Sequence, residues 1–216
     1  CACVKRRAAE IQKQDLSTLL PVDKETFSTF RLDYYSSQPD SRFGLSPRQM
    51  AQANLQRCRS FAEHFGSSYE NLLLYGSAGL GKTFLSSCIA RTVTERGFSV
   101  TYDTAISIFD QYNAVKFRTG DPAAAAHAVE RFRSADLLIV DDLGTEMPSS
   151  FHTSCLYDLI SRRLMSRKPT ILSTNLLPAE LENRYSQAIA SRILGEFTQL
   201  RFIGSDIRRI RKQQRL

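Results

Sequence analysis

Residues 74–85 read LYGSAGLGKTFL, and within them residues 76–83 match the pattern G-x-x-x-x-G-K-[ST]. A short apolar run, residues 71–75, precedes the pattern, and a stretch with helical character begins at Lys82. In a turn from strand to helix, glycines allow backbone N–H groups to face a phosphate, and the helix dipole adds positive potential. The stretch therefore predicts a phosphate-binding loop made of Gly76, Ser77, Ala78, Gly79, Leu80, Gly81, Lys82 and Thr83.

The last two residues of this loop have different expected tasks. Lys82 is expected to reach the β- and γ-phosphates of ATP or ADP, and the Thr83 hydroxyl is expected to take a place on Mg²⁺. The alternative is a glycine-rich turn with an exposed lysine. The position between a strand and a helix favours the phosphate loop, because the pattern requires that context.

Two adjacent carboxylates follow another apolar run. Residues 137–142 read LLIVDD, so Asp141 and Asp142 come where a buried strand leaves the core. A phosphate loop needs such an acid to order its metal, so Asp141 is expected to hold the Mg²⁺ shell and Asp142 to polarise the attacking water. Turn formation at a strand end is the alternative. Asp is one methylene shorter than Glu, so we expect slow ATP hydrolysis; Glu146 is a weaker candidate base.

Three further polar residues complete the set of candidate catalytic residues. Asn175 ends an apolar stretch, where its amide can bind the γ-phosphate or the attacking water. Arg192 lies late in the next predicted helix and could complete a neighbour's site as an arginine finger, with Arg184 as a lesser candidate. Arg208, at a helix start, could touch the γ-phosphate within its own chain. A turn asparagine and surface arginines are the alternatives.

Strands and helices alternate from about residue 47. The expected strands cover residues 71–75, 98–102, 137–140, 169–173 and 200–203. The expected helices cover 47–65, 82–96, 105–134, 150–167 and 178–197, and the third of these is in two pieces broken near 119–122. Apolar strands that alternate with helices predict an α/β fold with a parallel sheet covered on both faces.

The composition is ordinary for a soluble globular protein, with 42% hydrophobic and 24% charged residues among 216. No apolar run approaches the roughly 20 residues of a membrane span. No signal peptide is visible either, so a cytoplasmic protein without a membrane partner is expected. Cys58, Cys88 and Cys155 stand alone in expected helices, which favours small buried side chains.

Positive charge is concentrated at the C-terminal end. The formal net charge is +7, and residues 201–216 hold six basic residues against one acidic residue. Contact with nucleic acid or with an acidic protein is one explanation for this cluster. A solvated helix end is the other.

The stretches GSAGLGKT, LLIVDD, STN, SRI and GSDIR, in this order, resemble the AAA+ ATPases. More narrowly, the chain is similar to the DnaC/DnaI-type helicase loaders and to their relative IstB, a transposition helper, over about residues 20–212. The resemblance implies a five-stranded parallel sheet in the order 5-1-4-3-2, without a full C-terminal lid domain. It also implies a nucleotide site between self-associating subunits and ATP-controlled action on a hexameric replicative helicase.

The resemblance gives a role to residues 105–134 as well. They correspond in position to the helical insertion of initiator-type AAA+ proteins, which touches single-stranded DNA. Aromatic and basic side chains together suit a single strand. The candidate DNA contacts are Phe109, Tyr112, Lys116, Phe117 and Arg118, and helix packing is the alternative for the first two.

The N-terminus departs from the family pattern. Cys1 and Cys3 resemble half of a zinc ribbon of the DnaI type, but a closed zinc site needs four ligands, so zinc is expected only in a longer parent chain. The start at Cys1 rather than at Met indicates that upstream sequence is missing. The expected division is a remnant module with a linker helix at 1–20, a linker at 21–47, the ATPase domain at 48–212 and a basic tail at 213–216. The linker holds an aromatic anchor of Phe27, Phe30, Tyr34 and Tyr35.

Two functions remain open at this point. One is an ATPase that loads a replicative helicase onto single-stranded DNA during replication initiation. The other is an IstB-type helper that remodels duplex DNA for a transposase. The half zinc ribbon favours the loader, and the expected arginine finger disfavours a small-molecule kinase.

Overall fold

The computed structural model describes residues 16, 20, 22 and 24–213. The expected half zinc site of Cys1 and Cys3 lies outside these residues, as do most of the expected linker helix and residues 214–216 of the basic tail. Among the described residues, no helix is both long enough and apolar enough to cross a membrane. The three isolated cysteines are free and buried, as predicted.

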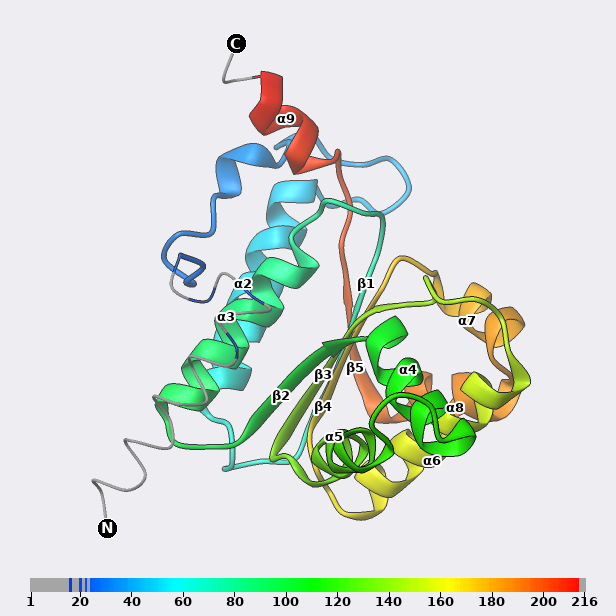
Figure 1. Cartoon of the computed structure of the whole chain (residues 1–216). Coiled ribbons are helices and arrows are strands. Elements are labelled where there is room, and N and C mark those ends of the chain that lie inside the picture. Colours follow the sequence, from blue (N-terminus) through cyan, green and yellow to red (C-terminus); the bar gives the residue numbers. More distant parts are fainter. Residues whose placement is uncertain (1–15, 17–19, 21, 23, 214–216) are drawn as a thin grey trace.

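The centre of the fold is a five-stranded parallel sheet (Figure 1). Its strands are β1 (Asn71–Tyr75), β2 (Val100–Thr104), β3 (Leu137–Leu143), β4 (Thr170–Thr174) and β5 (Phe197–Arg201). They lie in the order β2-β3-β4-β1-β5, so the predicted order 5-1-4-3-2 is confirmed, read from the opposite edge. Every pairing is parallel, and the carboxyl ends of all five strands therefore meet at one edge.

Helices cover both faces of the sheet (Figure 1). On one face lie α2 (Pro47–Glu63) and α3 (Lys82–Glu95). On the other lie α4 (Ala105–Phe117), α5 (Pro122–Ser134), α6 (Ser150–Met165), α7 (Pro178–Arg184) and α8 (Gln187–Glu196). The short 3-10 helix η1 (Leu32–Tyr34) precedes α2, and α9 (Ile207–Gln213) projects beyond the carboxyl edge.

The strands carry two separate cores because side chains alternate along them. On β1, Leu72 and Leu74 belong to the cluster under α2 and α3, whereas Leu73 and Tyr75 belong to the cluster under α4 to α8. All five β1 residues are buried, as expected for a central strand of a sheet with two covered faces. This strand positions the glycine-rich loop that follows it.

Four predicted elements differ from the structure in their boundaries. β5 occupies residues 197–201 rather than 200–203, because Phe197 pairs with Asn71 directly after α8 ends. β2 runs on to Thr104, where it pairs with Asp141, and β3 runs on to Leu143. The predicted helix over 178–197 is two helices, α7 and α8, separated at Tyr185 and Ser186.

Arg163, a buried arginine that no sequence motif singles out, joins segments at the amino-terminal end of the sheet. Arg163 on α6 is 1% exposed. Its guanidinium donates to the carbonyl oxygens of Phe132 (2.9 Å), Ala135 (3.0 Å) and Pro169 (2.7 Å) and to Thr170 Oγ1 (2.8 Å). It therefore joins the end of α5 to the start of β4. Burial lowers the pKa of Arg163 to about 10, which leaves it charged at neutral pH.

Arg163→Met is expected to destabilise the protein by about 3 kcal/mol, because several buried carbonyls lose their donor at about 1–3 kcal/mol each. For a chain of this size, the corresponding fall in Tm is about 6–12 °C. Arg162→Met is the matched control, since Arg162 is exposed and makes one ion pair with Asp158. Thermal unfolding that shows equal losses for both variants would contradict the structural role of Arg163.

Candidate functional site

The loop of residues 76–83 leaves β1 at the carboxyl edge and enters α3, as predicted. Gly79 has φ +73°, and a Cβ there would lie 2.0 Å from Asp206 Oδ1. Gly76 has φ +139°, and a Cβ there would lie 2.2 Å from the carbonyl oxygen of Phe202. Side chains are thus excluded from both positions, and the loop presents backbone where the sequence predicts a phosphate.

Lys82 folds back over the loop that contains it. Its Nζ donates to the carbonyl oxygens of Gly76 (2.5 Å) and Ser77 (2.9 Å) and to Asn175 Oδ1 (2.8 Å). The side chain is buried, and this burial lowers the pKa of Lys82 to about 8, although Asp142 and Asp141 act in the opposite direction. The predicted phosphate-binding cation and the predicted amide, which directly follows β4, are therefore in direct contact.

Asp141 lies next to Thr83, as the predicted metal pair requires. Thr83 Oγ1 donates to Asp141 Oδ2 over 2.9 Å, and Asp141 is 2% exposed. A hydroxyl and a carboxylate are the oxygen ligands that Mg²⁺ prefers. Together with the loop positions Gly76 and Gly79, which exclude side chains, this donor set fits a nucleotide with Mg²⁺.

Asp142 lies at an irregularity in the sheet. Its φ is +53°, and the pairing of β3 with β4 shifts register between Val140 and Leu143. Two hydrogen bonds stabilise this strained left-handed conformation: the Asp142 N–H donates to Asp141 Oδ1 (3.1 Å) and to Ser173 Oγ (3.2 Å). Partial burial and the charge of Asp141 raise the pKa of Asp142, which is the direction that suits a proton acceptor.

Arg208 is near the loop because the chain after β5 folds back onto it. The N–H of Ile207 donates to the carbonyl oxygen of Gly79 over 2.9 Å, and this contact sets the start of α9 beside the loop. The positive charge of Arg208 contributes to the lowered pKa of Lys82. In Asp142 it acts against the raised pKa, but burial and the charge of Asp141 are the larger effects. The structure thus brings Arg208, Asp142 and Lys82 to the same edge of the sheet.

Arg192 lies away from this cluster. It is half-buried on α8, donates to Tyr157 Oη over 2.7 Å and lies 4.8 Å from the centre of the Tyr157 ring. The lesser candidate, Arg184, instead pairs with buried Glu146 of its own chain. Tyr185 also donates to Glu146 over 2.6 Å, so Glu146 is held by structural contacts rather than free to act as a base.

The candidate DNA contacts fall into two groups. Phe109 and Tyr112 are 2% and 8% exposed and belong to the core under α4, so the prediction that they stack on bases is wrong. Phe117 is 61% exposed at the end of α4, beside the exposed Lys116 and Arg118. Phe151 on α6, which the sequence did not suggest, joins this group, since Lys116 Nζ lies 3.8 Å from its ring centre.

The aromatic anchor is also part of the site. Tyr35 is buried, and its hydroxyl donates to the carbonyl oxygen of Leu80 over 2.9 Å. Phe30 packs on Tyr35, with ring centres 5.7 Å apart, and on Phe84 of α3 at 5.4 Å. The segment before α2 therefore supports the glycine-rich loop from outside the sheet.

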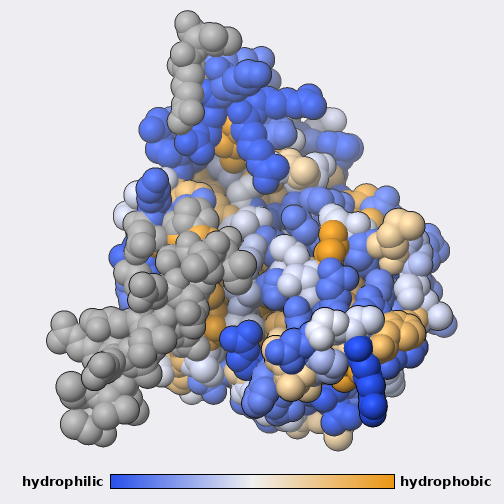
Figure 2. Space-filling model, in the orientation of Figure 1, coloured by the Kyte–Doolittle hydropathy of each residue, from blue (hydrophilic) through white to orange (hydrophobic). Residues whose placement is uncertain are grey.

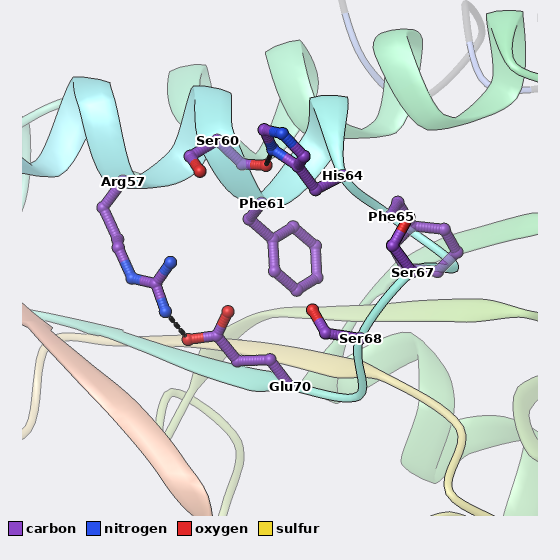
Figure 3. A pocket seen from close by; sticks show the side chains of 8 residues that line it. All are labelled: Arg57, Ser60, Phe61, His64, Phe65, Ser67, Ser68 and Glu70. Atoms are coloured by element: carbon purple, nitrogen blue, oxygen red, sulfur yellow. Dashed lines mark hydrogen bonds and ion pairs between the residues drawn. The ribbon is translucent and has the colours of Figure 1, made fainter.

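The surface carries two further features. The exposed cations of α9 give a hydrophilic surface beyond the carboxyl edge (Figure 2). A cavity of about 360 Å³ opens beside the end of α2, where Arg57 and Glu70 form an ion pair (Figure 3). Glu70 precedes β1, whereas the glycine-rich loop follows it, so this cavity is at the opposite edge and none of the predicted site residues lines it.

The glycine-rich loop, its lysine and the Thr83–Asp141 pair define a P-loop nucleotide-binding protein. Residues 40–214 match the profile of the IstB-like ATP binding protein family, and the chain belongs to this family. It is 25% identical over 141 residues to the replicative helicase loader DnaC of Escherichia coli K12, a match that covers 64% of this chain and 56% of that protein.

A second relative comes from a mobile element. The chain is 28% identical over 116 residues to a putative ATP-binding protein in an insertion sequence of Mycobacterium tuberculosis, covering 50% of this chain and 42% of that one. The chain thus spans about half the length of these curated relatives. The crystal structure of the DnaC helicase loader has the same fold, with a TM-score of 0.65, 19% identity and coverage of 83% of this chain and 97% of that one.

Proposed function

We propose that this chain is an ATP-hydrolysing switch that loads a hexameric replicative helicase onto single-stranded DNA. The observation that carries the proposal is the meeting of Lys82, Asn175 and the Thr83–Asp141 pair at one sheet edge, while Arg192 stays outside its own site. A site with every part except the arginine finger is the arrangement expected when a neighbouring subunit supplies that arginine.

In this proposal, Lys82 exchanges its bonds to the Gly76 and Ser77 carbonyls for bonds to the β- and γ-phosphates. Asn175, released from Lys82, orients the attacking water, and Asp142 accepts its proton. Arg192 of the next subunit stabilises the charge that develops in the transition state. When bound, Mg²⁺ would be held by Thr83 and Asp141 and would neutralise charge on the phosphates.

Assembly would bring the ends of α4 from several subunits around one DNA strand. Phe117 and Phe151 supply stacking surfaces, and Lys116 and Arg118 supply charge for the phosphates. The exposed cations of α9 are available for further backbone contacts. The resemblance of the chain to DnaC supports this function over a general nucleotide switch.

The second candidate function is that of a transposition helper that remodels duplex DNA. The family match and the relative from an insertion sequence favour it. The two functions differ in the DNA that the ATP-bound protein prefers. Fluorescence anisotropy with a labelled single strand and its duplex distinguishes them: tighter binding to the single strand supports the loader, and tighter binding to the duplex supports the helper.

Phe117→Ala is expected to weaken single-strand binding about 5- to 150-fold in the anisotropy assay, because stacking of one base on an aromatic ring contributes about 1–3 kcal/mol. Ile106→Ala is the matched control, since Ile106 is a 47% exposed apolar residue at the other end of α4. If the two variants bind the single strand equally well, the end of α4 is not a DNA contact.

A further inference from the structure

The carboxylate of Asp141 is surrounded by hydrogen-bond donors. Its Oδ2 accepts from Thr83 Oγ1 (2.9 Å) and from the Tyr102 hydroxyl (2.7 Å). Its Oδ1 accepts from Ser173 Oγ and from the Asp142 N–H. A carboxylate has about four acceptor positions, so these four donors account for all of them. The orientation of the Asp141 side chain is therefore fixed by these four hydrogen bonds.

Among the four donors to Asp141, Tyr102 differs in having no other role in the site. Thr83 is expected to bind the metal, Ser173 also accepts from the Asp142 N–H, and that N–H belongs to the strand itself. Tyr102 is 8% exposed near the end of β2, on the α3 side of the sheet.

We propose that Tyr102 is a positioning residue that orients Asp141 toward the Mg²⁺ of a bound nucleotide. The inference rests on the nucleotide site of the proposed function. Tyr102 and Thr83 both donate to Oδ2 of Asp141. If the Thr83 hydroxyl turned away from Asp141 to bind the metal, it would free one acceptor position on Oδ2, and the hydrogen bond from Tyr102 would remain. Tyr102 on one oxygen and Ser173 on the other keep the carboxylate from rotating.

The test is Tyr102→Phe, which keeps the ring and removes the hydroxyl. Affinity for a fluorescent ADP analogue is measured first in EDTA and then as a function of Mg²⁺ concentration. We expect the Mg²⁺ concentration for half-maximal effect to rise about tenfold or more, because partners of metal ligands typically contribute 10- to 100-fold to metal affinity. Affinity in EDTA is expected to stay within about twofold of wild type, since Tyr102 has no role toward the phosphates in this account.

Tyr112→Phe is the matched control. Tyr112 has the same 8% exposure, but it belongs to the core on the other face of the sheet, where its hydroxyl faces Arg133 rather than Asp141. The Mg²⁺ requirement of the Tyr112→Phe variant is expected to equal that of wild type. An unchanged requirement in Tyr102→Phe, or an equal rise in both variants, would overturn the positioning role. So would a loss of affinity in EDTA, which would indicate damage to the whole site. If wild type binds no nucleotide with or without Mg²⁺, the proposed function itself fails.

Discussion

Lys82→Ala is expected to abolish ATP binding and to leave the protein folded. The side chain supplies the only positive charge of residues 76–83. Loss of two hydrogen bonds to charged phosphates, at about 1.5–3 kcal/mol each, weakens binding by at least about 100-fold. We expect the variant to fold, because the cost of removing the Lys82 charge from water offsets the stability that its hydrogen bonds contribute. Calorimetric titration with ATP, together with thermal unfolding, measures both effects.

The matched control is Lys24→Ala, because Lys24 is an exposed lysine outside the loop. It is expected to bind ATP as wild type does. ATP affinity that is unchanged in Lys82→Ala would refute the assignment of the loop. A large fall in Tm in the same variant would mean that Lys82 holds the loop together rather than the phosphates.

The same lysine predicts how ATP affinity depends on pH. Burial lowers the pKa of Lys82 to about 8 in the empty protein, and the negative phosphates must raise it again in the complex. Above about pH 8, binding therefore takes up a proton, and ATP affinity falls as the pH rises. Titrations in buffers of different ionisation enthalpy detect this uptake. Affinity that is constant between pH 7 and pH 9 would contradict a lysine that is neutralised in the empty site.

Arg192→Ala is expected to spare ATP binding and to lower assembly-dependent hydrolysis about a thousandfold, the smaller end of the range for arginine fingers. In its own chain the Arg192 side chain contacts Tyr157, so its removal takes nothing from the Lys82 cluster. Turnover should rise with protein concentration in wild type and stay flat in the variant. Arg162→Ala, an exposed arginine on α6, is the control and should behave as wild type.

A mixing experiment separates a finger in trans from a local effect. Lys82→Ala subunits lack the phosphate lysine but retain Arg192, and Arg192→Ala subunits have the reverse. If the site is shared, an equimolar mixture recovers part of the hydrolysis that each variant lacks alone. No recovery at any concentration would place Arg192 outside the catalytic site.

The sequence predicts the phosphate loop and Asp141 because each signal is local. Eight consecutive residues carry the loop, and Asp141 directly follows four apolar residues. The order of the strands could be predicted only from the family resemblance, since the sequence of an apolar strand does not indicate which strands lie beside it. The predicted start of β5 is wrong because polar Thr198 and Gln199 separate Phe197 from the apolar residues that follow, and only the pairing of Phe197 with Asn71 fixes the boundary.

The side chains that support the site could not be predicted from local pattern. Tyr102 contacts Asp141 across 39 residues of sequence and Ser173 contacts it across 32, so no local pattern marks either contact. Phe109 and Tyr112 lie three positions apart on one helix face, a spacing that fits a core as well as a DNA surface. From sequence alone, Arg163 would be expected at the surface. Its burial follows from the packing of the end of α5 and the start of β4 around it.

Size-exclusion chromatography of the full natural protein with the hexameric replicative helicase of its own organism tests the loader function most directly. The runs compare ATP with Mg²⁺ against nucleotide-free buffer, with Lys82→Ala alongside. The loader account predicts co-elution in one stoichiometry with ATP, and loss of that complex in the variant. Separate elution in every nucleotide state would contradict it and favour the transposition helper, with duplex DNA as the next addition to the column.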